Sequence, residues 1–111
     1  MKFFFAFLIF ISFSSLADTR CDGKISDLAI GHGGVVLVTI PEQFSAVYIC
    51  SVVDKQNGVD PEACRAMYST LLAAKAAEKS VSITFLPAIS SCSMNKSWAW
   101  AQNINWIFLK N

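Results

Sequence analysis

One helix, expected over residues 60–79, constrains the fold more than any other stretch of the chain. Asp60 can cap the first backbone N–H groups, and Pro61 suits the first helical position because that position needs no N–H donor. Glu62 places negative charge at the positive end of the helix dipole. Apolar residues recur every three or four positions, so the helix has one side to bury, with a Leu71/Leu72 face that we expect to plug the interior. The repeating residues are Cys64, Met67, Tyr68, Leu71 and Leu72.

Short β-type segments lie on both sides of this helix, three before it and two after it. The segment after the helix alternates clearly, with Val81, Ile83 and Phe85 on one face. Ser82 and Thr84 occupy the other face, which we expect to be wet or paired differently. The five predicted strands are residues 24–30, 35–40, 46–53, 80–86 and 104–109.

The order of these elements favours one fold class. Three strands, a helix and two strands (βββαββ) is the order of the oligonucleotide/oligosaccharide-binding (OB) fold, a Greek-key barrel. We therefore expect a mainly β chain with one helix, folded as a five-stranded OB-like barrel. The alternative is a small α+β sheet with the helix packed across one face.

The N-terminal segment indicates export. Lys2 precedes an apolar run, residues 3–13, that is too short to span a bilayer comfortably. Residues 15–17 (Ser-Leu-Ala) place small side chains at the positions that a signal peptidase reads. We expect residues 1–17 to be a cleaved signal peptide. Residues 18–111 would then be a single small OB-like domain, secreted or periplasmic, with no membrane contact after cleavage. The alternative is an uncleaved membrane anchor.

The net charge of the mature chain restricts the classes of partner that we expect it to bind. Lys2 is the one charged residue of the signal segment, so eight lysines and arginines remain against eight acidic residues. A net charge near zero argues against nucleic acid as a partner, because phosphates require a basic face. It is compatible with a homo-oligomer, because little charge repulsion opposes self-association.

The cysteines predict the cross-links of the domain. An even number, four, remains in a small exported chain, which indicates two disulfides. The chain has no CxxC spacing and one histidine, so we expect no metal site. In the barrel the first and fourth strands pair antiparallel, which brings the start of one beside the end of the other. We therefore expect Cys21–Cys92, together with Cys50–Cys64 between the end of the third strand and the first turn of the helix.

A cluster of aromatic and amide side chains near the C-terminus is a candidate ligand site. Trp98 and Trp100 lie within a segment that also holds Asn95 and Asn103. Aromatic rings stack on the apolar faces of sugars, and amides bond to the hydroxyl groups, so this combination is typical of glycan binding. An exposed aromatic edge would equally suit a protein–protein interface.

Two further residues, Trp106 and His32, each have a structural and a functional interpretation. Trp106 shares strand spacing with Ile104 and Phe108, which favours a place in the core. His32 lies in a glycine-rich turn, residues 31–34, where it is either an exposed turn residue or a ligand contact.

No set of residues forms a catalytic constellation. One histidine, no suggestively spaced carboxylates and cysteines expected in disulfides leave little for acid–base or nucleophilic chemistry. We therefore expect a non-enzymatic, cofactor-free binding module that recognises glycan or a cell-surface or protein partner. The alternative is a periplasmic structural or interaction subunit with no small-ligand site.

Three segments carry a resemblance. VYICS (47–51), GVDPEAC (58–64) and MYSTLLAAKAAEKSVSITF (67–85) resemble a group of small exported bacterial proteins of unassigned function, over residues 46–92. In length, export, disulfides and element order the chain is also similar to the B subunits of pentameric bacterial toxins. Those are barrels that bind cell-surface glycans, so the similarity implies a glycan-binding ring. No toxin sugar-site motif is matched residue by residue.

Overall fold

The computed structural model describes residues 18–110, and the expected signal peptide, residues 1–17, lies outside them. In this part of the chain, six strands, one α-helix and one short 3-10 helix follow one another. Within residues 18–110, no helix combines the length and the apolar character needed to cross a bilayer. The elements are β1 (Thr19–Lys24), β2 (Asp27–Ile30), β3 (Val35–Ile40), β4 (Phe44–Ser51), α1 (Pro61–Ala76), β5 (Ser80–Phe85), η1 (Cys92–Met94) and β6 (Ile104–Leu109).

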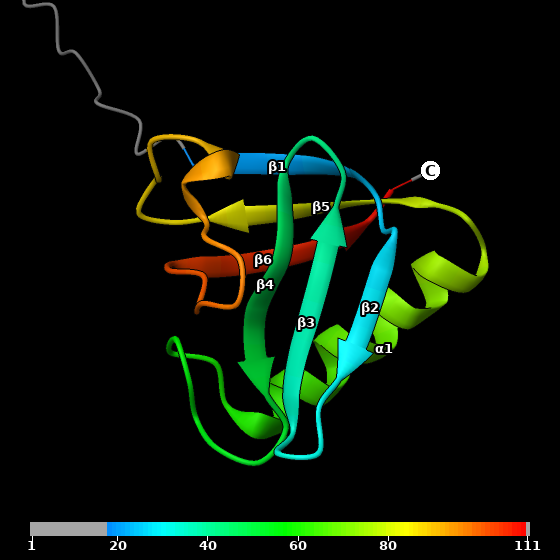
Figure 1. Ribbon diagram of the computed structural model, residues 1–111, viewed down its shortest axis with the longest axis vertical. Coiled ribbons are helices and arrows are strands. Elements are labelled where there is room, and N and C mark those ends of the chain that lie inside the picture. Colours follow the sequence, from blue (N-terminus) through cyan, green and yellow to red (C-terminus); the bar gives the residue numbers. More distant parts are fainter. Residues whose placement is uncertain (1–17, 111) are drawn as a thin grey trace, which may run out of the picture.

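The strands form two three-stranded sheets instead of the expected closed five-stranded barrel. One sheet has the order β1-β5-β6 and the other has the order β2-β3-β4. Figure 1 shows the two sheets crossing, with β1, β5 and β6 above and the β2–β3–β4 hairpins running across them. Every pairing within the sheets is antiparallel. The prediction of a mainly β chain with one helix is confirmed, and the prediction of a closed barrel is wrong.

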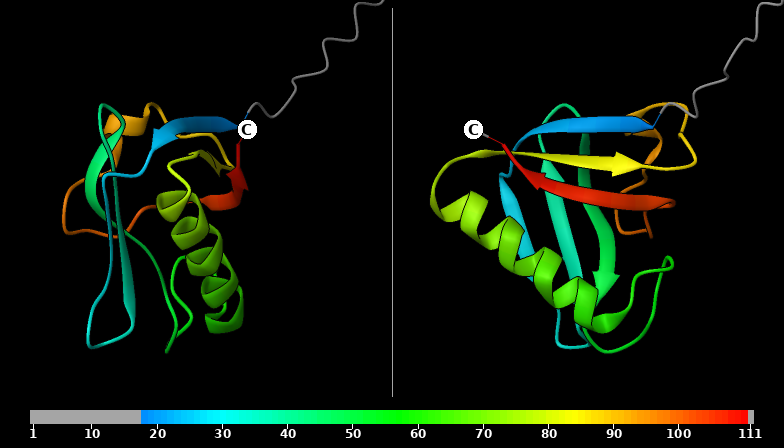
Figure 2. Two further views of the ribbon diagram at one scale, coloured as in Figure 1. Left: turned by 90° about the vertical axis from the view of Figure 1, so that its right-hand side faces the viewer. Right: turned by 180° about the vertical axis from the view of Figure 1, so that it is seen from behind.

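The barrel does not close because, within the described residues, β6 pairs with β5 and not with β4. The loop before β6 contacts β4 instead, through an isolated parallel bridge between Tyr48 and Trp100. The helix α1 lies across the open side and contacts β6 and β5 of one sheet and β4 and β2 of the other. Figure 2 shows α1 in front of β2, β3 and β4 and below the β1-β5-β6 sheet when the molecule is seen from behind. The helix therefore joins the two sheets where strand pairing ends.

The predicted first strand, residues 24–30, contains β2 and the last residue of β1, so most of β1 was not predicted. β1 pairs with β5, and β2 pairs with β3, so the chain changes sheets between them. Ile25, at the corner, is buried, and the Ser26 N–H donates to the Thr39 carbonyl at 3.0 Å. A Cβ on Gly23 would lie 2.6 Å from Cγ2 of Ile40, so only glycine permits this close approach of β1 to β3.

The helix begins where the sequence predicts and ends earlier. Pro61 is its first residue, but the Asp60 side chain makes no capping hydrogen bond and instead lies 3.7 Å from the Lys55 amine. The helix ends at Ala76, three residues before the predicted end. Glu78 adopts a left-handed backbone conformation (φ 54°), which stops the helix, and the Lys79 N–H donates to the Ala74 carbonyl at 2.9 Å.

The buried face of α1 is narrower than predicted. Cys64, Leu71 and Ala74 are buried, whereas Leu72 is 49% exposed. Leu72 therefore does not share in plugging the interior. The buried helix residues pack against inward-facing side chains of both sheets, such as Val38 and Ile83.

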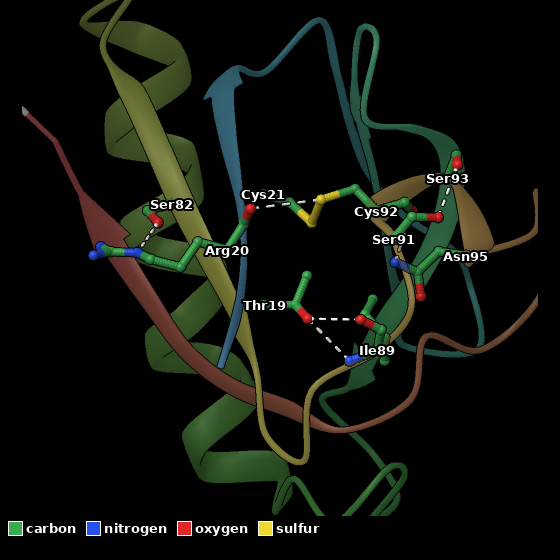
Figure 3. Close-up of a disulfide and its surroundings, with 9 residues drawn as sticks. All are labelled: Thr19, Arg20, Cys21, Ser82, Ile89, Ser91, Cys92, Ser93 and Asn95. Atoms are coloured by element: carbon green, nitrogen blue, oxygen red, sulfur yellow. Dashed lines mark hydrogen bonds between the residues drawn. A yellow bond between two sulfur atoms is a disulfide. The ribbon is translucent and has the colours of Figure 1, made fainter. Parts of the chain in front are cut away.

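Both predicted disulfides are present, Cys21–Cys92 and Cys50–Cys64. The strand that pairs antiparallel with β5 is β1, which lies mostly before the predicted first strand; Cys21 in β1 lies opposite Ile83, which brings it beside the loop that holds Cys92. Figure 3 shows this disulfide together with a pair of hydrogen bonds that also joins β1 to the loop after β5. The Thr19 hydroxyl donates to the Ile89 carbonyl at 2.8 Å and accepts from the Ile89 N–H at 3.0 Å.

The outer face of the β1-β5-β6 sheet is covered by its own side chains. Ser82 and Thr84 are fully buried, so of the two alternatives predicted for this face of β5, wet or paired differently, the first is wrong. Arg20, Phe108 and Trp106 lie over them: the Arg20 guanidinium is 5.4 Å from the Phe108 ring centroid, and that ring stacks on Trp106 at 5.9 Å. We call these three side chains the Arg20–Phe108–Trp106 stack.

Trp106 is therefore not a core residue, contrary to the prediction from strand spacing. It is 61% exposed, and Phe108 is 41% exposed. Ile107 lies opposite the buried Ile83, so the inward-facing phase of β6 is the one that contains Ile107. A register shift between Ile83 and Phe85 separates this phase from Ile104, which is partly buried.

Candidate functional site

A hollow of about 410 Å³ lies over the outer face of the β2-β3-β4 sheet, between the turn after β2 and the loop before β6. We call it the Trp98 hollow. Its floor consists of Ala29, Leu37 and Tyr48, which face one another across the three strands. Its lining residues are Ala29, Ile30, Gly31, His32, Gly33, Val35, Leu37, Tyr48 and Trp98. Most of these are apolar, which is the usual character of a small-ligand site.

A bulge in β4 aims Tyr48 into the hollow. Val36 pairs with Cys50, but the next residue, Leu37, pairs with Tyr48, so Ile49 is an extra residue in β4. Ile49 and Cys50 are both fully buried and Tyr48 faces outward. Bulges commonly re-aim a side chain in this way beside functional sites. Here the bulge lets Cys50 reach the helix while Tyr48 stays on the surface.

Trp98 forms the wall of the hollow opposite the turn. Its ring stands edge-on to the Tyr48 ring, with 6.4 Å between centroids and 77° between planes. The backbone N–H of Trp98 donates to the Ala46 carbonyl at 2.7 Å, and the backbone N–H of Tyr48 donates to the Ala99 carbonyl at 2.9 Å. These bonds hold the loop against the free edge of β4 and fix the position of the indole.

The backbone of Trp98 is strained. Its φ is 59°, a left-handed conformation that costs a bulky residue about 1–2 kcal/mol. The ring is 69% exposed, so burial of the ring offsets little of this cost. Strained residues of this kind concentrate at functional sites, where the surrounding structure holds them in place. The observation therefore favours a role for Trp98 in binding.

The predicted site residues separate into three places. His32 and Trp98 both line the Trp98 hollow, and His32 is exposed there in its turn. Asn95 and Trp100 line a neighbouring hollow of about 310 Å³. Asn103 lines neither of these two hollows.

Each of the two predicted amides donates one hydrogen bond to a backbone carbonyl. Asn95 is 8% exposed, and its Nδ2 donates to the Cys92 carbonyl at 3.1 Å. The Nδ2 of Asn103 donates to the Pro87 carbonyl at 3.1 Å. Asn95 is buried and Asn103 is exposed, so the role of Asn103 as a ligand contact stays a prediction.

Trp100 supports the site from behind. It is partly buried, and its ring stands edge-on to Tyr48, with 5.4 Å between the centroids. Tyr48 is thus in contact with both Trp98 and Trp100. Sequence reasoning missed Tyr48 and Leu37, although the alternation in V-Y-I places Tyr48 out of phase with its buried neighbours Val47 and Ile49.

Comparisons with models of protein families, with curated proteins and with solved structures find no match to this chain. Within residues 18–110, histidine, cysteine, aspartate and glutamate side chains form no group of three that could hold a metal ion. The chemistry of the Trp98 hollow therefore rests on its own residues. His32, Tyr48 and Trp98 supply the side-chain hydrogen-bonding atoms in an otherwise apolar lining.

The outer face of the other sheet is a second aromatic surface. The Arg20 Nε–H donates to the Ser82 hydroxyl at 3.3 Å, which holds the guanidinium beside Phe108. A hydrogen bond from Ser82, together with the nearby Lys110 and Arg20, holds the pKa of Asp22 below its ordinary value. The Lys110 amine lies 3.3 Å from the Asp22 carboxylate. This face thus combines exposed aromatic rings with ordered charges.

Proposed function

We propose that the chain is an exported, non-enzymatic binding module whose ligand occupies the Trp98 hollow, and that this ligand is a sugar ring of a surface glycan. The observation that carries the proposal is the exposed Trp98 indole, fixed in a strained conformation beside Tyr48. A sugar ring would stack an apolar C–H face on the indole and place hydroxyl groups near His32 and the Tyr48 hydroxyl. The size of the hollow, about 410 Å³, suits a small ligand.

Export supports this proposal without deciding the ligand. The two disulfides are compatible with an oxidising compartment. The likeness to the B subunits of pentameric toxins points in the same direction through element order and the antiparallel pairing of β1 with β5. We propose this relationship as an explanation for a glycan-binding role, and the experiments below test it.

Replacing Trp98 should weaken glycan binding and leave the fold intact. We expect Trp98→Ala to weaken binding by about tenfold or more, because a buried aromatic contact at the centre of a site carries much of the binding energy. The free energy of unfolding should change by less than about 1 kcal/mol, because the ring is 69% exposed. Glycan-array screening of the secreted protein, followed by calorimetric titration of each hit, measures the first effect, and urea unfolding measures the second.

Trp106→Ala is the matched control for this experiment. Trp106 is also an exposed tryptophan, at 61%, but it lies on the outer face of the other sheet. We expect this variant to bind glycan as the parent does. Equal loss of binding in both variants, or no glycan hit for the parent protein, would contradict the proposal.

A second candidate function is favoured by the Arg20–Phe108–Trp106 stack. Arginine and aromatic residues are enriched at protein interfaces, and here they form one ordered and exposed surface. In this alternative the chain is a periplasmic structural or interaction subunit with no small-ligand site. Its partner would be another protein or further copies of the chain.

The mass of the native secreted protein tests the second candidate. If the stack joins subunits, we expect an oligomer whose mass falls to that of the monomer in Trp106→Lys, because a charge in an apolar interface is costly. Trp98→Lys is the control and should leave the mass unchanged. A pentamer would also support the toxin-like relationship. A parent protein that is monomeric at micromolar concentration would rule out the self-associating form of this alternative.

A further inference from the structure

We propose that the corner between β1 and the end of α1 is a binding site for a sulfate or phosphate group. Three lysines line a hollow of about 230 Å³ there. The hollow shares no residue with the Trp98 hollow, so this site is independent of the proposed glycan site. The residues that line it are Lys24, Ile25, Ala74, Lys75, Glu78 and Lys79.

The fold brings these lysines together from three segments. Lys24 is the last residue of β1 and lies opposite Ser80, the first residue of β5. Lys79 immediately precedes Ser80, and Lys75 lies in the last turn of α1. The base of the hollow is firm because Ala74 is fully buried and Ile25 is 6% exposed.

The lysines carry charge that the protein does not neutralise locally. Within residues 18–110, no carboxylate oxygen lies within 4.0 Å of the amines of Lys24, Lys75 or Lys79, whereas Lys55 and Lys110 each have such a partner. Glu78 lines the same hollow but forms no ion pair with them. Three positive charges and one negative charge therefore face one hollow in a chain whose total formal charge is only +1.

The helix end does not account for this arrangement. Lysines in the last turn of a helix often interact with its negative end, which explains Lys75 and Lys79. It does not explain Lys24, which belongs to β1. The Ala73, Ala74 and Lys75 carbonyls already accept hydrogen bonds from the N–H groups of residues 77, 79 and 78, so these carbonyls do not need the amines. The amines remain available to an anion.

A tetrahedral oxyanion fits the hollow by charge and by size. Its volume, about 230 Å³, equals that of roughly eight liquid water molecules, enough for a sulfate or phosphate group and part of its hydration shell. Lysine amines bind such groups as point charges. The group could belong to a free ion, to a sulfated sugar or to a lipid headgroup, since all three present the same charged oxygens.

Sulfate titration with charge-changing variants tests the site. We expect saturable amide shifts at Ile25 and Lys79 when sodium sulfate is added to the ¹⁵N-labelled secreted protein at constant ionic strength. Lys24→Gln should weaken sulfate binding about fivefold, and Glu78→Gln should strengthen it by a similar factor. Lys96→Gln, which removes an exposed lysine outside this hollow, should change nothing.

The outcome is decisive in both directions. Opposite effects of the Lys24 and Glu78 variants, with no effect of the Lys96 variant, support the site. Absence of saturation, or equal weakening by Lys24→Gln and Lys96→Gln, overturns it. Inorganic phosphate, a sulfated heparin disaccharide and phosphatidylglycerol vesicles then separate the three sources. The probe whose affinity falls most in Lys24→Gln identifies the source of the anionic group. If none of the three probes loses affinity in this variant, the proposal is overturned.

Discussion

Removing the Cys21–Cys92 disulfide should lower the free energy of unfolding by about 4–5 kcal/mol. The bridge spans 71 residues of sequence, so it excludes a large share of the conformations open to the unfolded chain. Cys21 is also fully buried against the inner face of the β1-β5-β6 sheet. We expect Cys21→Ala/Cys92→Ala to unfold at a much lower urea concentration than the parent, measured by circular dichroism.

The other disulfide is the control for this effect. Cys50–Cys64 spans only 14 residues, for which the loss predicted from loop closure is about 3 kcal/mol. Cys50→Ala/Cys64→Ala should therefore be less destabilised than the first double variant. The reverse order would show that strain or residual structure in the unfolded state, and not loop length, controls the stability of this chain.

Phe85→Ala should cost about 3–5 kcal/mol of unfolding free energy. Phe85 is fully buried in β5, the central strand of its sheet, and is among the largest buried side chains. Its removal leaves a cavity that the rigid two-sheet packing cannot close completely. Chemical unfolding of the purified variant measures the change.

Trp106→Ala in the same sheet should cost only about 1 kcal/mol. It removes a stacking contact with Phe108 and little burial, because the indole is 61% exposed. The comparison is informative because tryptophan is the larger residue. A loss as great as that of Phe85→Ala would place Trp106 in the core, as the strand spacing alone predicts.

The disulfides and the helix start could be read from the sequence because each rests on local or pairwise rules. The pairing of Cys21 with Cys92 was predicted from an antiparallel pairing of the first strand with the strand after the helix, and β1 makes that pairing with β5, although β1 lies mostly before the predicted first strand, residues 24–30. Pro61 marks the start of the helix through its fixed φ. Such signals survive any change in how the two sheets are placed.

The orientation of β6 could not be read in this way. Alternation in the segment from Ile104 to Leu109 favours Trp106 with Ile104 and Phe108 on the inner face, because the other phase contains the polar Asn105. The structure selects Ile107 for the inner face through its pairing with Ile83, and a register shift near Phe85 alters the phase beyond it. The stack over Ser82 and Thr84 follows from that choice.

The candidate site, too, could be predicted only in part from the sequence. The sequence indicates that Trp98 and His32 can be exposed to a ligand, because Trp98 lies in a polar loop and His32 lies in a glycine-rich turn. It does not indicate that they line the same hollow, nor that Tyr48 lies between them as part of the floor. Asn95 and Asn103 were expected to contact a ligand, but each bonds to a nearby backbone carbonyl.

The sequence by itself determined the local elements, the cross-links and the position of the helix between the strands. Periodicity, turn residues and cysteine spacing act over short distances or through one pairing, so they need no knowledge of the whole. Only the tertiary structure decided that the strands form two open sheets and that α1 joins them. It also decided which aromatic rings remain exposed, because that depends on register and bulges, where a slip of one residue exchanges the two faces of a strand.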